Sequence, residues 1–454
     1  MKKPKLLVLI SIILTLCVLF CSNIAADDKP EATGYNQALN NVCDYGAIPN
    51  DGEDDTLAFK LTLNDSKDAI YVPPGIYNIS DSIIINGTSL YGSGTDKTVI
   101  IADIASVRDP IIWAGDASQI RDLTIKFADH CINGTEVSGE RCGIITSSKG
   151  VRRLCRGAAI SNVNIDNVGT GIYSPVSTVL EKYRTKEMIA GTERWVGDAC
   201  AFSVTFEGIS VKNFSFRGIS MEAINRTGNV WRNIYLSSGK YEANTAFYFN
   251  TEESESSITE ITVADSKLKN GIRCNETLGV QITNLNFINT ELVEDNTAFL
   301  YCDEANVTIN GLTFKNSAPQ TDKQAFIRLG DGSYRGYYYF PSNAYLHIYN
   351  MSILNPDLDI TPDATQYMIS RRNEYLSSYT VDIDNLRIVA PSDIKAQYEA
   401  FNYDKRDINL TLEGVKNNER GKQYEKIFII IFSIIASCIV CCFLHFRQRR
   451  NRVV

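Results

Sequence analysis

The chain has 454 residues, of which 44% are hydrophobic and 22% charged, and this balance excludes a disordered chain and fits one long folded domain. Its formal net charge of -8 argues against a general nucleic-acid binder, because such proteins need a basic surface. Any site for an acidic ligand must therefore be a local cluster of basic side chains.

Residues 1–26 have the pattern of a secretory signal peptide. Lysines at the start precede an apolar run from Leu6 to Cys21, and Ala25 and Ala26 offer a small-residue cleavage site. An uncleaved membrane anchor is the alternative. Either way, we expect the rest of the chain to be exported to a compartment where disulfides and N-linked glycans form.

A short helix is expected before the first repeat. Asp55 can cap its amino end, and Leu57 and Leu61 would share one face. We expect this amphipathic helix to cover the open end of a repeat array, because an uncovered end would expose core residues and unpaired strand edges.

A seven-residue phrase recurs through the chain and predicts its fold. Its copies begin at Gln119, Ala159, Thr205, Val230, Ser257, Gln281, Thr308, His347 and Asp382. The second, fifth and seventh places are apolar, as in a strand with one buried face. The fourth place is usually Asn, Gly or Asp, which tolerate the left-handed backbone of a sharp bend.

Each copy of the phrase is too short to make a core alone. The base period of about 24 to 27 residues, with longer steps, is typical of a repeat array with insertions. Stacked copies would bury a continuous apolar column, with Asn side chains laddered at the corners. The phrase therefore predicts an all-β, parallel β-solenoid; an ordinary β-sandwich is the alternative.

Short motifs also precede the first full copy. They are Asp44-Tyr45-Gly46-Ala47, Asp51-Gly52, Asp54-Asp55-Thr56 with Ala58, and Pro73-Pro74-Gly75-Ile76-Tyr77. These motifs resemble the opening of the pectate-lyase-like superfamily, and most closely its rhamnogalacturonase and epimerase-like pectate lyase domains. The resemblance implies a right-handed parallel β-helix over residues 42–415.

The same resemblance implies a carbohydrate-active function. It points to a polysaccharide lyase, hydrolase or epimerase acting on acidic polysaccharide, with calcium as a cofactor of the lyases in this superfamily. A non-catalytic surface protein that binds glycans or a partner cell is the alternative. The expected partner is thus a polysaccharide or cell-surface glycan and no nucleic acid.

The catalytic motifs of the polygalacturonase relatives are not found. The Asn-Thr pairs at Asn244 and Asn296 are followed by Ala, the Gly-Asp pairs lack a second Asp, and no His precedes Gly. Arg387-Ile388 is followed by Val389 rather than Lys. The paired-carboxylate machinery of that hydrolase branch is therefore not carried over to this chain.

Long insertions between repeats are expected to form loops that wall a groove. The insertion at 173–200 and the residues that follow it provide our candidate site. We assign Arg217, Glu222 and Asp198 as candidate catalytic residues and Arg194, Trp195 and Arg226 as candidates for substrate binding. Arg can hold a uronate carboxylate through two hydrogen bonds, and Trp can stack on a sugar ring. The alternative is that these charges are solvated and that the Trp packs its own loop.

The carboxyl-terminal region has the pattern of a membrane anchor. A polar stalk, 416–426, precedes the apolar run Ile427–Leu444, which is long enough to span a bilayer. We expect a transmembrane helix over 427–446, with a buried core helix as the weaker alternative. Because the tail 447–454 is rich in arginine, we expect a single-pass type I membrane protein whose repeats are extracellular or lumenal.

Glycosylation is predicted from the Asn-x-Ser/Thr pattern. The predicted acceptors are Asn64, Asn78, Asn86, Asn133, Asn213, Asn225, Asn275, Asn306 and Asn409. The exported part also holds an odd number of cysteines, which permits disulfides but leaves at least one unpaired or intermolecular. None has zinc-site spacing, so no metal ligands are assigned.

Overall fold

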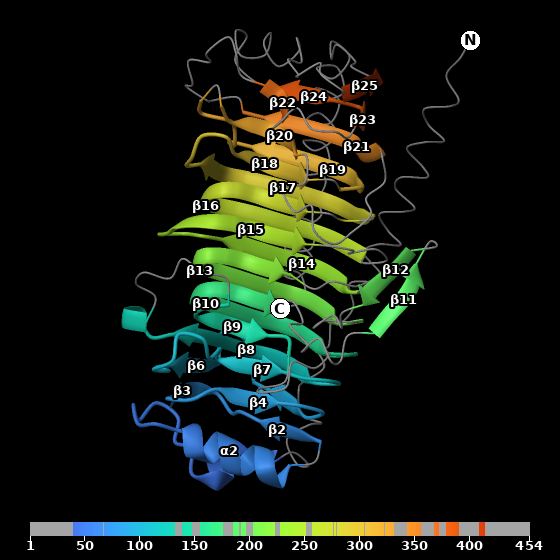
Figure 1. Ribbon diagram of the computed structural model, residues 1–454. Coiled ribbons are helices and arrows are strands. Elements are labelled where there is room, and N and C mark those ends of the chain that lie inside the picture. Colours follow the sequence, from blue (N-terminus) through green and yellow to red (C-terminus); the bar gives the residue numbers. More distant parts are fainter. Residues whose placement is uncertain are drawn as a thin grey trace, which may run out of the picture.

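The fold is a stack of parallel β-strands, seen in a computed structural model (Figure 1). The structure describes residues 40–413 except 67, 132–138, 148–154, 176–184, 190–191, 197–202, 223–227, 251–256, 276, 278, 304, 322, 331–342, 356–366, 372–377 and 390–407. Nearly all described strands join one 23-stranded sheet that winds along the stack. The predicted all-β solenoid is confirmed, and the β-sandwich alternative is wrong because the strand pairs of this sheet are parallel.

Each full turn of the stack contributes strand segments to three columns. The first column includes β1 (Asn40–Asn41), β2 (Ala69–Tyr71), β5 (Ser89–Tyr91), β23 (Ser378–Asp384) and β25 (Ile408–Glu413). The second includes β3 (Gly75–Ile79), β6 (Thr98–Ala102) and β24 (Arg387–Val389). The third includes β4 (Ile83–Ile85), β7 (Ile112–Ala114), β9 (Cys142–Ile145), β15 (Glu242–Asn250), β18 (Ala298–Asp303), β20 (Ala325–Gly330) and β22 (Tyr367–Arg371).

The longer strands bend from one column into the next. Those that pass the corner between the first and second columns are β8 (Gln119–Phe127), β14 (Val230–Ser237), β17 (Val280–Leu292), β19 (Val307–Lys315) and β21 (Asn343–Leu354). Those that continue into the third column are β10 (Ala159–Ser174), β13 (Thr205–Met221) and β16 (Ser257–Asn275). The last described strand is β25, which contains Leu410 and pairs with β23.

The first corner is the fourth place of the recurring phrase. Every copy has a positive φ there, as predicted, including the copy in which Glu260 takes the place of Asn, Gly or Asp. Amide ladders also form: Asn162 Nδ2 donates to Asp122 Oδ1 at 2.6 Å, and Asn385 Nδ2 donates to Asn350 Oδ1 at 3.3 Å. Short polar side chains that bond across turns stabilise a backbone conformation that bulkier residues avoid.

The core is a continuous apolar column inside the three columns of strands. Its members include stacked aromatic pairs from successive turns, with Phe206 and Trp231 rings 3.7 Å apart and Phe287 and Phe314 rings 5.3 Å apart. These side chains are fully buried. Since each turn packs only on its neighbours, this column provides the apolar burial that no single repeat could supply.

The amino-terminal end is covered by α2 (Thr56–Asp65), which follows η1 (Val42–Tyr45) (Figure 1). The capping helix was predicted, but its buried face was not. Leu57 and Leu61 are 67% and 44% exposed, whereas Phe59 and Thr62 are buried. The helix thus turns one aromatic ring and small side chains toward the stack, and the predicted leucine face is wrong.

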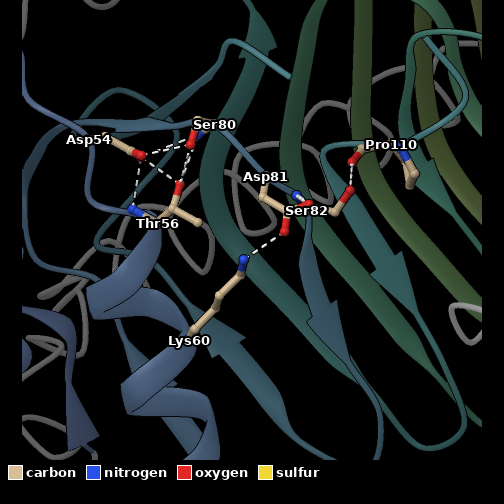
Figure 2. A network of polar contacts seen from close by, with 7 residues as sticks. All are labelled: Asp54, Thr56, Lys60, Ser80, Asp81, Ser82 and Pro110. Carbon is tan, nitrogen blue, oxygen red and sulfur yellow. Dashed lines mark hydrogen bonds and ion pairs between the residues drawn. The ribbon is translucent and has the colours of Figure 1, made fainter. Parts of the chain in front are cut away.

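The helix start is fixed by Asp54 rather than by Asp55. Figure 2 shows Asp54 Oδ1 accepting from the Thr56 backbone N at 3.0 Å and Asp54 Oδ2 accepting from Ser80 Oγ at 2.6 Å. Asp55 occupies the cap position without a side-chain bond to the helix; it accepts instead from the backbone N of Ile48 and of Asn78. Lys60 adds an exposed ion pair to Asp81 at 2.6 Å (Figure 2). These contacts join the helix to the first turns of the stack.

Several predictions fall outside the described residues: the signal peptide 1–26, the stalk 416–426, the transmembrane helix 427–446 and the tail 447–454. Within the described part, no helix combines the length and apolarity needed to cross a bilayer. The cysteines described there without a disulfide are Cys43, Cys142, Cys155, Cys274 and Cys302.

Candidate functional site

An outward-facing row of tyrosine and arginine side chains runs along the third column. In strand order it reads Tyr173, Ser220, Tyr248, Arg273, Tyr301 and Arg328, each in register with the next. Their strand neighbours Ile219, Phe247 and Ile272 are fully buried in the core. Because side chains alternate along a strand, the row points away from the core. Tyr173, Tyr248 and Arg273 are half-buried, whereas Ser220, Tyr301 and Arg328 are buried. We call this row, together with Arg217, Glu222 and Asp303, the arginine–tyrosine face.

Arg217 and Glu222 lie together at one end of the face. Arg217 Nη1 is 2.7 Å from Glu222 Oε1 and donates to Ser220 Oγ at 2.8 Å. The hydroxyl of Tyr173 donates to Glu222 Oε2 at 3.2 Å. The side chains of Arg217 and Glu222 are only 14% and 18% exposed, so water screens their ion pair less than a surface pair. The structure therefore brings together two of the predicted site residues.

The guanidinium groups of this face lie over tyrosine rings. Arg217 Cζ is 3.9 Å from the ring centroid of Tyr248, and Arg273 Cζ is 4.8 Å from that of Tyr301. Such cation–π contacts hold the planar guanidinium groups flat along the sheet. Burial raises the pKa of Tyr248, although the charges of Arg273 and Arg217 act in the opposite direction. Its hydroxyl therefore stays protonated at neutral pH and can donate a proton.

A second carboxylate lies farther along the face. Arg273 Nη2 is 3.3 Å from Asp303 Oδ2, and the side chain of Asp303 is only 2% exposed. Gly330 makes room for this pair, because a Cβ there would lie 2.5 Å from Asp303 Oδ1. By register, Asp303 is three strands from Glu222, which corresponds to about 14 Å of backbone separation.

The remaining predicted site residues are not brought into the face. Arg194 and Trp195 belong to β12 (Thr192–Val196), which pairs antiparallel with β11 (Thr185–Ile189) in a separate two-stranded sheet. Only the backbone of this hairpin is described. Asp198 and Arg226 lie outside the described residues. The roles assigned to these four residues therefore stay predictions.

Most residues of the face lie outside the insertions from which the candidate site was predicted. A signal was present: apolar–polar–apolar triplets such as Phe247-Tyr248-Phe249 and Ile272-Arg273-Cys274 precede copies of the phrase. The polar residue of each triplet points outward by strand alternation. The distance from triplet to phrase varies, so only the structure shows that these residues share one row.

The residues of the face do not fit a calcium site. Calcium takes six to eight oxygen ligands, commonly from several carboxylates. Glu222 and Asp303 are each held by an arginine and lie about 14 Å apart by register. In the described part of the chain, no group of three or more His, Cys, Asp or Glu side chains could hold a metal ion.

The predicted glycosylation sites differ in their surroundings. Asn64 and Asn86 are exposed, and Asn78 and Asn306 are half-buried. Asn275 is buried, and Asn213 donates to Asp166 Oδ1 at 2.8 Å. Of Asn409 only the backbone is described, and Asn133 and Asn225 lie outside the described residues. Glycan attachment at these positions stays a prediction.

Comparisons with known proteins find several solved structures that are similar to this chain. Similar solved structures include the catalytic domain of Agl-KA, 13% identical over 83% of this chain and 68% of that one, with a TM-score of 0.49. The catalytic domain of a GH87 α-1,3-glucanase in complex with tetrasaccharides is 14% identical over 81% of this chain and 67% of that one, with a TM-score of 0.46. The A-module of the Azotobacter vinelandii mannuronan C-5 epimerase is 14% identical over 83% of this chain and all of that one, with a TM-score of 0.41.

No curated protein sequence matches the chain. Residues 39–244 match the family described as rhamnogalacturonase A/epimerase, pectate lyase-like, and this segment contains the opening motifs and the first turns of the stack. The resemblance carried by those motifs is thereby confirmed for this part of the chain, which is similar to the rhamnogalacturonase A/epimerase, pectate lyase-like family.

Proposed function

We propose that the arginine–tyrosine face binds an acidic polysaccharide and that the protein cleaves it by elimination. One observation carries the proposal: the half-buried guanidinium groups of Arg217 and Arg273 both lie over the ring of Tyr248, at 3.9 and 5.8 Å from its centroid, in a chain whose formal net charge is -8. The family match supports a carbohydrate ligand.

The chemistry of these side chains suits a uronate-containing polymer. A guanidinium group can hold a carboxylate through two parallel hydrogen bonds. A tyrosine ring between two guanidinium groups offers an apolar surface for the C–H face of a sugar, with a hydroxyl at its edge. A polymer laid across the strands would meet the ring of Tyr248 and, one strand spacing of about 4.8 Å farther, the guanidinium group of Arg273.

Elimination is the reaction that the face supports best. An arginine neutralises the uronate carboxylate, which acidifies the neighbouring C–H bond. Glu222 takes that proton, the bond between the ring and the leaving oxygen breaks, and a carbon–carbon double bond forms. The leaving oxygen takes a proton from the Tyr248 hydroxyl, whose raised pKa keeps it protonated.

Hydrolysis by the two carboxylates of the face is less well supported. Glycosidases place their carboxyl groups about 5 to 9.5 Å apart across the scissile bond. The register separates Glu222 and Asp303 by about 14 Å, and each carboxylate is held by an arginine. The hydrolase motifs are also missing from the sequence.

A non-catalytic glycan-binding or adhesion role is the second candidate. It is favoured by the internal ion pairs, because Arg217 and Arg273 already bond carboxylates of the chain itself. A ligand carboxylate would replace Glu222 or Asp303 as the partner of the arginine. Such replacement gives binding and requires no reaction.

The two candidates are separated by the products. The full chain would be incubated with polygalacturonate, alginate, hyaluronan and neutral dextran, and the products read by mass spectrometry. We expect unsaturated fragments from an acidic polymer, lighter by one water than hydrolysis products, and at least ~100-fold slower release by Glu222→Gln. Lys323→Ala, which removes an exposed ion pair to Asp295, is the matched control and should behave as wild type.

Three other outcomes of this experiment would change the proposed function or its site. Retention of an acidic polymer without fragments would favour the adhesion role. Fragments that had gained water would mean hydrolysis, and full elimination activity in Arg217→Ala would exclude the proposed site.

We also propose that the domain is anchored to a membrane with its repeats extracellular or lumenal. The apolar run Ile427–Leu444 and the arginines after it support this proposal. Protease added to sealed membrane vesicles of known orientation tests it: the repeats should be digested only when the outer or lumenal face is accessible. Recovery of the full chain in the soluble fraction would contradict the anchor.

A further inference from the structure

A second polar surface lies on another part of the stack, at the corner between the first and second columns. A groove of about 450 Å³ spans β14, β16 and β17 there. Its polar lining consists of Asn233, Tyr235, Glu260, Thr262, Asn284 and Asn286. We call it the Glu260 groove. Its volume falls within the range of small-ligand sites.

The groove is a regular grid of side chains on three successive turns. Tyr235, Thr262 and Asn286 are in register on the second column and form one row. Asn233, Glu260 and Asn284 are the left-handed corner residues of the same strands and form a second, exposed row. Two strand spacings, about 10 Å, separate the outer members of each row.

Glu260 breaks the rule that the rest of the corner column follows. In the other copies of the phrase this position is Asn, Asp or Gly, which tolerate a left-handed backbone. Glu260 has the same left-handed backbone, with φ 59°, although a glutamate side chain does not favour it. Strain of this kind persists where the residue has a role that a better-suited residue could not fill.

The side chains of the corner row also lack the hydrogen bonds that corner residues make on other turns of the stack. Asn162 and Asn350 ladder with neighbouring turns. In the described part of the chain, no hydrogen bond or ion pair engages the side chains of Asn233, Glu260 or Asn284. Gly208 and Gly311 occupy the corner positions on either side, so no side chain closes the ends of the row.

We propose that the Glu260 groove binds a neutral saccharide, separately from the arginine–tyrosine face. A carboxylate accepts hydrogen bonds from adjacent sugar hydroxyls, and the amides of Asn233 and Asn284 both donate and accept. Tyr235 offers a ring to the C–H face of the sugar. The lining contains no lysine or arginine, and Glu260 disfavours an acidic sugar. Lys212 lies at the margin, with Nζ 5.8 Å from the centre of the Tyr235 ring.

A cation is the less suitable ligand. The groove has one carboxylate, and the described residues contain no group of three or more His, Cys, Asp or Glu that could hold a metal ion. Hydroxyl groups match a lining of one carboxylate, three amides and a threonine better than a hard divalent cation does.

The test uses the full chain and neutral gluco-, manno-, galacto- and xylo-oligosaccharides as probes, with binding followed by saturation-transfer NMR and calorimetry. We expect at least one of these classes to bind. Glu260→Asn restores the residue type common at the corner, so it should raise the melting temperature while weakening binding at least 10-fold. Arg217→Ala should leave neutral-sugar binding unchanged, which separates this site from the proposed elimination site.

Asn162→Ala is the matched control. It removes a laddered corner amide, so it should lower the melting temperature without changing saccharide affinity. The proposal is overturned if none of the oligosaccharides binds, or if Glu260→Asn binds as tightly as wild type. It is also overturned if calcium binds and Glu260→Gln abolishes that binding, because the groove would then be a cation site.

Discussion

The arginine–tyrosine face and the Glu260 groove are built on the same stack and share strand β16, yet their polar groups are used differently. On the face, Arg217 and Arg273 are neutralised by Glu222 and Asp303 and lie over tyrosine rings. In the corner row of the groove, the side chains of Asn233, Glu260 and Asn284 have no such partners among the described residues. The comparison teaches that the stack fixes only where outward rows lie, while the residue types in each row decide which ligand the row can hold.

The largest expected effect on stability comes from a substitution in the core that supports both surfaces. Phe287 is fully buried, and its ring is 5.3 Å from Phe314 and 5.5 Å from Phe299. Phe287→Ala should lower the free energy of unfolding by about 3 to 5 kcal/mol through the cavity it leaves. Chemical denaturation measures this.

Leu57→Ala provides the control for that change. Leu57 is 67% exposed on α2, so its truncation should cost less than about 0.5 kcal/mol. Equal costs for the two variants would mean that the core has been placed wrongly.

The next largest effect is on ligand affinity and comes from a substitution in the arginine–tyrosine face. Arg217→Ala should weaken binding of an acidic polysaccharide by about 2 kcal/mol, because a charge-assisted contact is lost and Glu222 remains without its cation. Arg217→Lys should recover only part of this, since an ammonium group cannot form two parallel bonds. Calorimetry with polygalacturonate measures both, and full affinity in Arg217→Lys would contradict bidentate recognition.

A smaller effect concerns pH and the capping helix. Burial alone would raise the pKa of Asp54, but hydrogen bonds from Ser80 and Thr56 outweigh it and lower the pKa below its ordinary value. A lowered pKa stabilises the fold above the unfolded-state value, and this contribution is lost as the pH falls through the folded-state value. Asp54→Asn should cost about 1 kcal/mol at neutral pH.

Unfolding of both proteins at neutral and acidic pH measures this contribution. The difference between wild type and Asp54→Asn should shrink as the solution is acidified below the ordinary range of carboxyl groups. A difference that stays constant with pH would exclude the charge of Asp54 as its cause.

The smallest effect has the opposite sign. Glu260→Asn should stabilise the fold by about 0.5 to 1 kcal/mol, because Asn adopts the left-handed corner with less strain. Thermal unfolding measures this, and a destabilised variant would mean that Glu260 has a structural partner in place of a ligand.

Local rules in the sequence were enough to predict the corners. Asn233, Asn284 and Asn385 were identified because left-handed backbone restricts residue choice at a fixed place in the phrase. Apolar alternation likewise predicted the strands that follow each corner. Both signals depend on neighbours a few residues away, so the fold class could be predicted without a structure.

The face could not be predicted in the same way. Arg273 and Tyr301 belong together only through the register of successive turns, and insertions change the number of residues per turn. The leucines of α2 show a related limit: helical spacing placed Leu57 and Leu61 on one face correctly, but Phe59 and Thr62 meet the stack. Which face is buried depends on the partner surface, and no local pattern contains that partner.

The most direct test of the central claim is binding of the full chain to polygalacturonate, measured by calorimetry at low and at high salt, for wild type and for Arg273→Ala. We predict binding that weakens as salt screens the charges, and a loss of at least 10-fold in Arg273→Ala, with neutral dextran not competing. Equal affinity for wild type and Arg273→Ala, or binding that salt does not change, would contradict the claim that the arginine–tyrosine face recognises acidic polysaccharide.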